Sequence, residues 1–109
     1  LVTRDPRDQF ASLKLRKGAN SVEGFVDWYK EMQRRIEDIN NSNVLKLKFE
    51  EFVKENKKNV KILCNHTGLN PTTFSSYQSE LSKKNIGTFR EVLSKSDVDV
   101  IERSLSSYI

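Results

Sequence analysis

The sequence is poor in the residues that build disulfides, metal sites and membrane spans. It holds a single cysteine, Cys64, and a single histidine, His66. One cysteine cannot close an intrachain disulfide, and one Cys with one His cannot complete a zinc site. No stretch approaches the roughly 20 apolar residues of a membrane-spanning helix. We therefore expect no disulfide, no metal and no membrane segment in this chain, and a reducing, cytoplasmic location.

Glycine is also scarce, and its spacing argues against one common type of phosphate site. The four glycines are isolated, so the P-loop pattern G-x-x-x-x-G-K-[ST] does not occur. The 109 residues carry a formal net charge of +4 and a pI of about 9.3. This charge suits an anionic ligand, but it is spread along the chain and does not require a nucleic acid as partner.

The first twelve residues form a motif that suits an anion. Residues 1–3 are typical of the end of a strand, and Asp5 followed by Pro6 is typical of a helix start. Asp8, three residues after Asp5, completes a capping-box arrangement. Arg4 stands at the junction, where free N–H groups, the helix dipole and a guanidinium together favour a negative charge. Ser12 lies about two helical turns past the cap and can add a hydroxyl.

Helical periodicity accounts for most of the chain. The expected helices cover residues 6–17, 22–39, 56–64 and a last segment that begins at Ser96 as its N-cap. Gly18 and Gly68 are expected to end the first and third helices, because glycine readily adopts the left-handed conformation found past helix ends. Residues 72–81 are polar and are expected to form a loose helix or a loop.

In one short stretch, apolar and polar side chains alternate instead of following the helical period. Residues 44–49 place apolar side chains at every second position, which predicts a strand with Leu45, Leu47 and Phe49 on one side. Helix is expected to resume at Glu50. The chain is therefore expected to be α/β, helix-rich, with about two parallel strands.

The N-terminal motif resembles the 3′-phosphate-binding motif of sulfotransferases that use 3′-phosphoadenosine-5′-phosphosulfate (PAPS). The residues that carry the resemblance are Arg4-Asp5-Pro6-Arg7-Asp8, followed by Ser12. In that family the motif is a strand, then R-[DN]-P-x-D, then a serine. The first Arg and the Ser hold the 3′-phosphate of the nucleotide, so the resemblance assigns that role to Arg4 and Ser12.

Two further stretches are similar to motifs of the same family. Phe49-Glu50-Glu51 resembles the family motif Y-E-[DE], which stands at the end of a strand. The Tyr of that motif lies near the adenine. Phe49 keeps the aromatic ring of that Tyr but lacks its hydroxyl. Residues 82–90 resemble the closing R-K-G-x-x-G-[DR]-W-[KR], with Ser82 in place of the Arg and Lys84 in place of the first Gly. The resemblance makes Lys83 and Lys84 a second clamp on the 3′-phosphate. If the resemblance is set aside, the residues alone suggest that Phe49 is a core residue and that residues 82–84 form a solvated basic loop.

The resemblance implies one partial domain over residues 1–109, the C-terminal half of a P-loop-like sulfotransferase fold. Such a chain grips PAPS, or its product 3′-phosphoadenosine-5′-phosphate (PAP), while a sulfuryl group passes to a hydroxyl on a sugar or small molecule. The family's phosphosulfate loop and catalytic base lie upstream of the motif, so no catalytic residue is assigned here, and His66 is expected at an exposed helix end. Self-association through a face that the missing half would cover is a further expectation.

A competing interpretation is a non-enzymatic basic helical module that binds RNA or an acidic partner. Its support is the number of lysines and arginines, 19 in all. Against it, the sequence has no signature of an RNA-binding fold, and aromatic residues are not interleaved with the basic ones.

Overall fold

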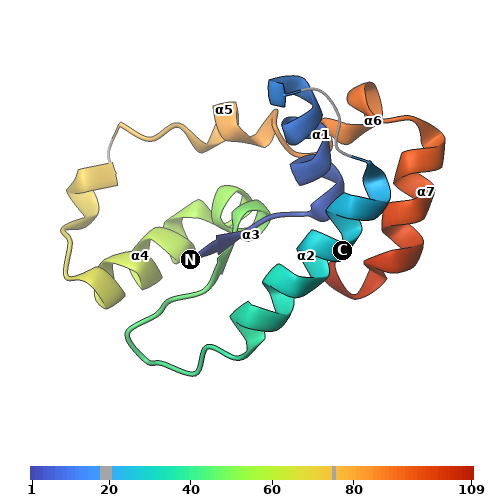
Figure 1. The fold of residues 1–109 in the computed structure, drawn as a ribbon. Coiled ribbons are helices and arrows are strands. Elements are labelled where there is room, and N and C mark those ends of the chain that lie inside the picture. Colours follow the sequence, from blue (N-terminus) through green and yellow to red (C-terminus); the bar gives the residue numbers. More distant parts are fainter. Residues whose placement is uncertain (18–20, 75) are drawn as a thin grey trace. The chain divides into compact units, whose positions relative to one another are not determined.

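The structure is a computed structural model that describes residues 1–17, 21–74 and 76–109 (Figure 1). The chain divides into two compact units, and each is described by itself. The strand unit comprises Leu1–Arg4 and Asn41–Ile86. The helical unit comprises Asp5–Asn40 and Gly87–Ile109, so most of the strand unit is inserted between its two segments.

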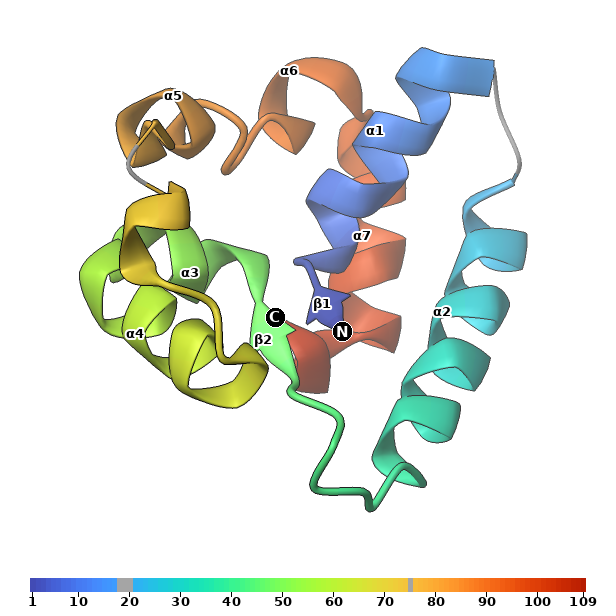
Figure 2. The ribbon, with the colours of Figure 1, turned by 90° about the vertical axis from the view of Figure 1, so that its left-hand side faces the viewer.

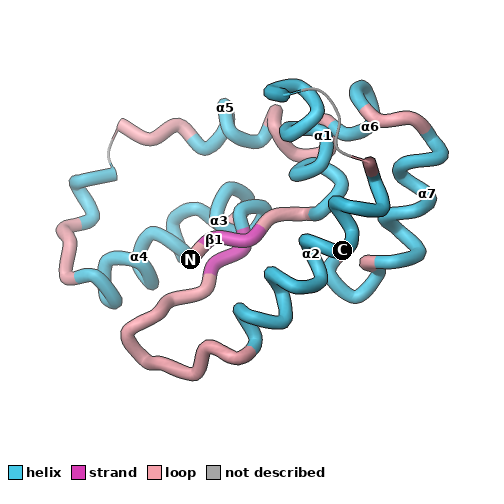
Figure 3. The backbone as a smooth tube through the Cα atoms, in the orientation of Figure 1, coloured by secondary structure: helices cyan, strands magenta, loops and turns pink. Residues whose placement is uncertain are grey.

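The strand unit contains a two-stranded parallel sheet. Val2 pairs with Leu47 and Thr3 with Lys48, and Figure 3 shows the strands side by side. The N-terminal amine donates to the carbonyl of Leu45 at 2.9 Å and so extends the pairing by one contact. The elements of this unit are β1 (Val2–Thr3), β2 (Leu47–Lys48), α3 (Phe49–Lys54), α4 (Asn56–Thr67), the 3-10 helix η1 (Pro71–Phe74) and α5 (Ser79–Lys83).

The helical unit holds the main hydrophobic core. Its elements are α1 (Pro6–Lys17), α2 (Val22–Glu37), α6 (Phe89–Val92), α7 (Lys95–Ser104) and the 3-10 helix η2 (Ser106–Tyr108). Helix α1 lies against α6 and α7, and α2 lies against α7 (Figure 2). The core that they enclose consists of Phe10, Ala11, Val22, Phe25, Val26, Tyr29, Phe89, Leu93, Ile101 and Leu105.

Several local predictions are confirmed. Helix α1 spans the expected residues, and Asp5 caps it by accepting the backbone N–H of Arg7 at 2.9 Å. Ser21 caps α2 in the same way, through the N–H of Gly24 at 3.1 Å. Gly68 ends α4 at φ 77° and donates its N–H to the carbonyl of Cys64 at 2.8 Å. The helix-rich α/β class with two parallel strands is likewise confirmed.

The second strand is shorter than predicted, and Phe49 is not part of it. The strand expected over 44–49 is reduced to Leu47–Lys48, the two residues that pair with β1. Phe49 is instead the first residue of α3, where Glu50 and Glu51 occupy the first turn. Acidic side chains stabilise a helix N-terminus through its dipole, so they favour the helix starting this early.

The start of the last helix was also predicted two residues late. Ser94, not Ser96, is the N-cap of α7, and its Oγ accepts the N–H of Asp97 at 3.1 Å. Both serines have a hydroxyl that can cap, and the difference is set by the backbone. Residue 94 is extended, at φ −67° and ψ 155°, as an N-cap requires.

Asp8 does not act as the expected capping-box residue. Its side chain is buried, with 1% of the residue exposed. One carboxylate oxygen accepts the N–H of Gly87 at 2.9 Å, and the other accepts the N–H of Phe89 at 3.0 Å and the hydroxyl of Thr88 at 3.4 Å. A buried carboxylate needs such donors, and these come from a turn about 80 residues away in the sequence.

We predict that Asp8→Ala lowers the free energy of unfolding by about 2–4 kcal/mol, because it leaves the buried N–H of Phe89 and that of Gly87 without their acceptor. Urea unfolding followed by circular dichroism measures the loss. Asp27→Asn on the exposed face of α2 is the matched control and should stay within about 0.5 kcal/mol of the wild type. A loss below 1 kcal/mol for Asp8→Ala would contradict this account.

Candidate nucleotide-binding site

The parallel strands place Arg4 and Phe49 at the same edge of the sheet. Thr3 pairs with Lys48, and Arg4 and Phe49 are the next residues along each strand direction. The guanidinium carbon of Arg4 lies 5.2 Å from the centroid of the Phe49 ring, a cation–π distance. In open α/β sheets, ligands bind at the carboxyl ends of parallel strands, and Arg4 and Phe49 occupy that position here.

A second contact joins Arg4 to the turn after α5. Its Nη2 donates to the carbonyl oxygen of Asn85 at 2.7 Å. That turn is closed by two backbone bonds, from the N–H of Asn85 to Ser82 O at 3.0 Å and from the N–H of Ile86 to Lys83 O at 3.1 Å. The structure therefore brings Arg4 together with the segment that carries the predicted second clamp.

The two lysines of that clamp differ in their surroundings. Lys83 is on α5 and forms an ion pair with Glu80, with Nζ 2.7 Å from the carboxylate. Lys84 is the C-cap residue of α5 and is exposed. An exposed ion pair contributes little to stability, about 0–1 kcal/mol, so Lys83 can exchange Glu80 for a bound anion at small cost.

Ser12 belongs to the other unit. It lies in the second turn of α1 in the helical unit and is half buried. Arg4, Phe49, Lys83 and Lys84 all belong to the strand unit. The expected pairing of Ser12 with Arg4 thus joins residues of two units and stays a prediction.

Net positive charge is concentrated in the strand unit. Nine Lys and Arg residues against four Glu give it a formal charge of +5. The helical unit has ten basic and eleven acidic residues and a formal charge of −1. The overall +4 of the sequence is therefore carried by the unit that contains Arg4, which favours anion binding there.

The second arginine of the N-terminal motif has a structural role that sequence reasoning missed. Arg7 forms a two-bond fork with Asp5, with Nη2 2.7 Å and Nε 3.1 Å from the two carboxylate oxygens. Its Nη1 lies 2.9 Å from Glu102 on α7, and its guanidinium carbon lies 4.4 Å from the centroid of the Phe89 ring. The hydrogen bonds to Asp5, followed by the bond to Glu102, raise the pKa of Arg7 although burial lowers it.

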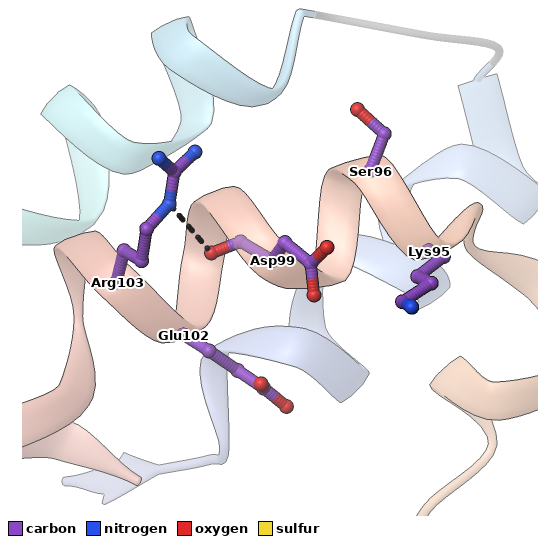
Figure 4. Close-up of a pocket in the computed structure, with 5 residues that line it drawn as sticks. All are labelled: Lys95, Ser96, Asp99, Glu102 and Arg103. Carbon is purple, nitrogen blue, oxygen red and sulfur yellow. Dashed lines mark hydrogen bonds between the residues drawn. The ribbon is translucent and has the colours of Figure 1, made fainter.

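A hollow along α7 does not assemble a site. It measures about 770 Å³ and is lined by five α7 residues, Lys95, Ser96, Asp99, Glu102 and Arg103 (Figure 4). Arg103 and Ser96 point toward one side of the helix and Lys95 and Glu102 toward the other, and Arg103 Nε donates to the Asp99 carbonyl at 3.3 Å. Side chains that diverge from one helix cannot surround a ligand, so this hollow carries no assignment.

Other chemistry-bearing side chains have local roles. His66 is exposed, as expected, and its Nε2 lies 3.0 Å from the carbonyl oxygen of Asn43. Cys64 is buried. Among residues 1–17, 21–74 and 76–109, His, Cys, Asp and Glu side chains do not gather in the groups of three or more that hold a metal, and no helix is long and apolar enough to cross a membrane.

Comparison with known proteins does not supply a family. No protein-family model matches the sequence, no curated protein matches it, and no solved structure matches the fold. The assignment of a function therefore depends on the residues around Arg4.

We predict that Arg7→Gln destabilises the protein by about 1–3 kcal/mol, because Asp5 and Glu102 lose a shared, partly buried cation. Chemical denaturation measures the change. Arg16→Gln, an exposed arginine on the same helix, is the matched control and should change stability by about 0.5 kcal/mol or less. Equal effects of the two variants would show that the Asp5–Arg7–Glu102 contacts do not support the fold.

Proposed function

We propose that this chain grips the 3′-phosphate of PAPS or PAP as the nucleotide-holding part of a sulfotransferase. The observation that carries the proposal is the position of Arg4. Its guanidinium stands at the carboxyl edge of both strands, over the Phe49 ring and bonded to Asn85 in the turn that follows Lys83 and Lys84. Arg4, Phe49, Lys83 and Lys84, which come from three stretches that resemble nucleotide-binding motifs, thus belong to one unit.

The chemistry of these groups suits a phosphate. A guanidinium is planar and presents five N–H donors in a fork that matches phosphate oxygens, so the bond to Asn85 is compatible with a further contact to an anion. The ammonium groups of Lys83 and Lys84 act as mobile point charges beside it. Ser12, which the resemblance also assigns to the 3′-phosphate, belongs to the helical unit, so the phosphate contacts proposed for the strand unit are those of Arg4, Lys83 and Lys84. The formal charge of +5 on the strand unit favours the anionic ligand.

Phe49 is proposed to contact the adenine of the nucleotide. Its side chain is half buried, so part of it is open to solvent while the ring also contacts Arg4. An aromatic face stacks on a base without reading its edges, which fits the loss of the hydroxyl that the family's tyrosine carries.

The proposal assigns binding of the nucleotide and not the transfer step. Sulfuryl transfer to a hydroxyl needs a base for the acceptor's proton and donors that stabilise the leaving phosphate. The residues that carry the proposal, Arg4, Phe49, Lys83 and Lys84, are assigned to binding the nucleotide, and no catalytic base is assigned among them. The acceptor, a hydroxyl on a sugar or small molecule, is inferred from the family resemblance alone.

Calorimetry with two nucleotides tests the proposal. PAP should bind about 10- to 100-fold more tightly than adenosine 5′-phosphate, because it adds charge-assisted hydrogen bonds from the clamp. Arg4→Ala should remove most of this preference, and Arg4→Lys, which keeps the charge and loses the fork, should remove part of it. Arg16→Ala, which removes the same charge from the exposed face of α1, should keep the preference.

Circular dichroism and thermal melting of each variant establish that it is folded before its affinity is interpreted. Equal affinity of the wild type for PAP and adenosine 5′-phosphate would overturn the proposal. Binding of oligonucleotides with a steep salt dependence and no preference for a 3′-phosphate would instead support the basic-module interpretation.

A further inference from the structure

A second hollow lies in the helical unit, where α1 and α2 contribute its walls; we call it the α1–α2 hollow. It measures about 460 Å³ and is lined by Leu13 of α1 and by Ser21, Gly24, Phe25 and Trp28 at the start of α2. None of these five side chains carries a charge. Pockets that hold small molecules have volumes of about 300–1,000 Å³ and mainly apolar walls. The α1–α2 hollow therefore has the size and the lining of a small-molecule pocket.

Trp28 gives the α1–α2 hollow an exposed aromatic wall. Its ring lies against the ring of Phe25, with the centroids 5.9 Å apart, and Phe25 contacts Phe10 in the core at 4.9 Å. Phe25 is buried, whereas 49% of Trp28 and 37% of Leu13 are exposed. Apolar surface that is left in water gains free energy when an apolar group covers it. The exposed parts of Trp28 and Leu13 therefore favour an apolar ligand in this hollow.

Gly24 is a glycine that the backbone conformation of the fold does not require. It is helical, whereas the described glycines with positive φ are Gly68 and Gly87. Glycine inside a helix lowers its stability relative to alanine. Apart from chain neighbours and the helix backbone, the described atom that lies within 4 Å of a Cβ placed on Gly24 is Ser21 Oγ, at 3.1 Å. The absent side chain thus leaves the hollow open down to the helix backbone.

We propose that the α1–α2 hollow binds an uncharged, planar aromatic small molecule, with its ring against Trp28 and its edge over Gly24. The flat face of an indole favours a ring as its partner, and walls without charge disfavour an ion. The bare backbone at Gly24 allows a ligand to approach the helix closely. This site goes beyond the proposed function, because it uses none of the residues assigned to the nucleotide and requires no hydroxyl on its ligand.

Coumarin, a planar bicyclic compound without a hydroxyl, is the probe, and 1-decalone, a saturated bicyclic ketone, is its non-planar control. Trp28 is the only tryptophan of the sequence, so saturable quenching of its fluorescence by coumarin reports binding beside it. Calorimetry on the full chain should show that coumarin binds about 3- to 10-fold more tightly than 1-decalone, and Trp28→Leu should remove this preference. A wild type without saturable quenching, or with equal affinities for the two compounds, would overturn the inference.

Gly24→Leu tests the site by filling it. This variant should lower the affinity for coumarin about 10-fold or more, because its side chain occupies the hollow. Its melting temperature should stay the same or rise, since leucine favours a helix more than glycine does. Gly24→Ala should cause a smaller loss of affinity. Lys30→Leu, which adds the same side chain at another exposed position of α2, is the matched control and should leave the affinity unchanged.

Three outcomes of these measurements contradict the inference. A lower melting temperature of Gly24→Ala would show that the fold itself needs this glycine. An unchanged affinity of Gly24→Leu for coumarin would show that the ligand does not lie over residue 24. Gel filtration tests a second copy of the chain as the occupant: a wild-type dimer that becomes a monomer in Trp28→Leu would show that this face is an interface between copies.

Discussion

The buried carboxylate of Asp8 is the contact on which the helical unit depends. That unit is made of two segments separated by residues 41–86, and Asp8 on the first segment accepts the N–H groups of Gly87 and Phe89, at the very start of the second. Because both oxygens are used, the contact fixes the turn as well as the distance between the segments. The Phe89 ring can then join the core with Phe10, and Arg7 can lie over its face.

Arg4 and Arg7 belong to the same short motif but make different kinds of contact. Arg7 is bonded to two carboxylates, Asp5 and Glu102, which neutralise it and make it part of the fold. Arg4 contacts the backbone carbonyl of Asn85 and the Phe49 ring in the strand unit. The peptide bond between Arg4 and Asp5 is also where the chain passes from one unit to the other. The contacts of Arg4 with Asn85 and Phe49 and those of Arg7 with Asp5 and Glu102 therefore belong to different units.

Sequence reasoning succeeded where the signal was local. The cap at Asp5, the cap at Ser21 and the left-handed Gly68 each depend on residues within four positions, and the sequence shows them directly. It failed where the partner is distant: Asp8 could be recognised as an acid in a first turn, but not as the acceptor for Phe89. The bounds of β2 were also predicted wrongly, because only Leu47–Lys48 pair with β1 and Phe49 already begins α3. Arg4 and Phe49 were named from a motif, and their contact with each other follows only from the parallel register.

The strand unit has less apolar burial than the helical unit, and this affects how a ligand would act on it. Among its described residues, the buried apolar side chains are Val53 and Cys64, whereas the main core lies in the helical unit. The order of the strand unit therefore depends more on polar contacts such as Arg4 to Asn85 and Tyr77 to Ser82. A ligand that binds only the folded form stabilises it in proportion to the logarithm of its concentration over Kd. A nucleotide held at this turn would thus strengthen the contacts that keep its own site assembled, so binding and local folding would be coupled.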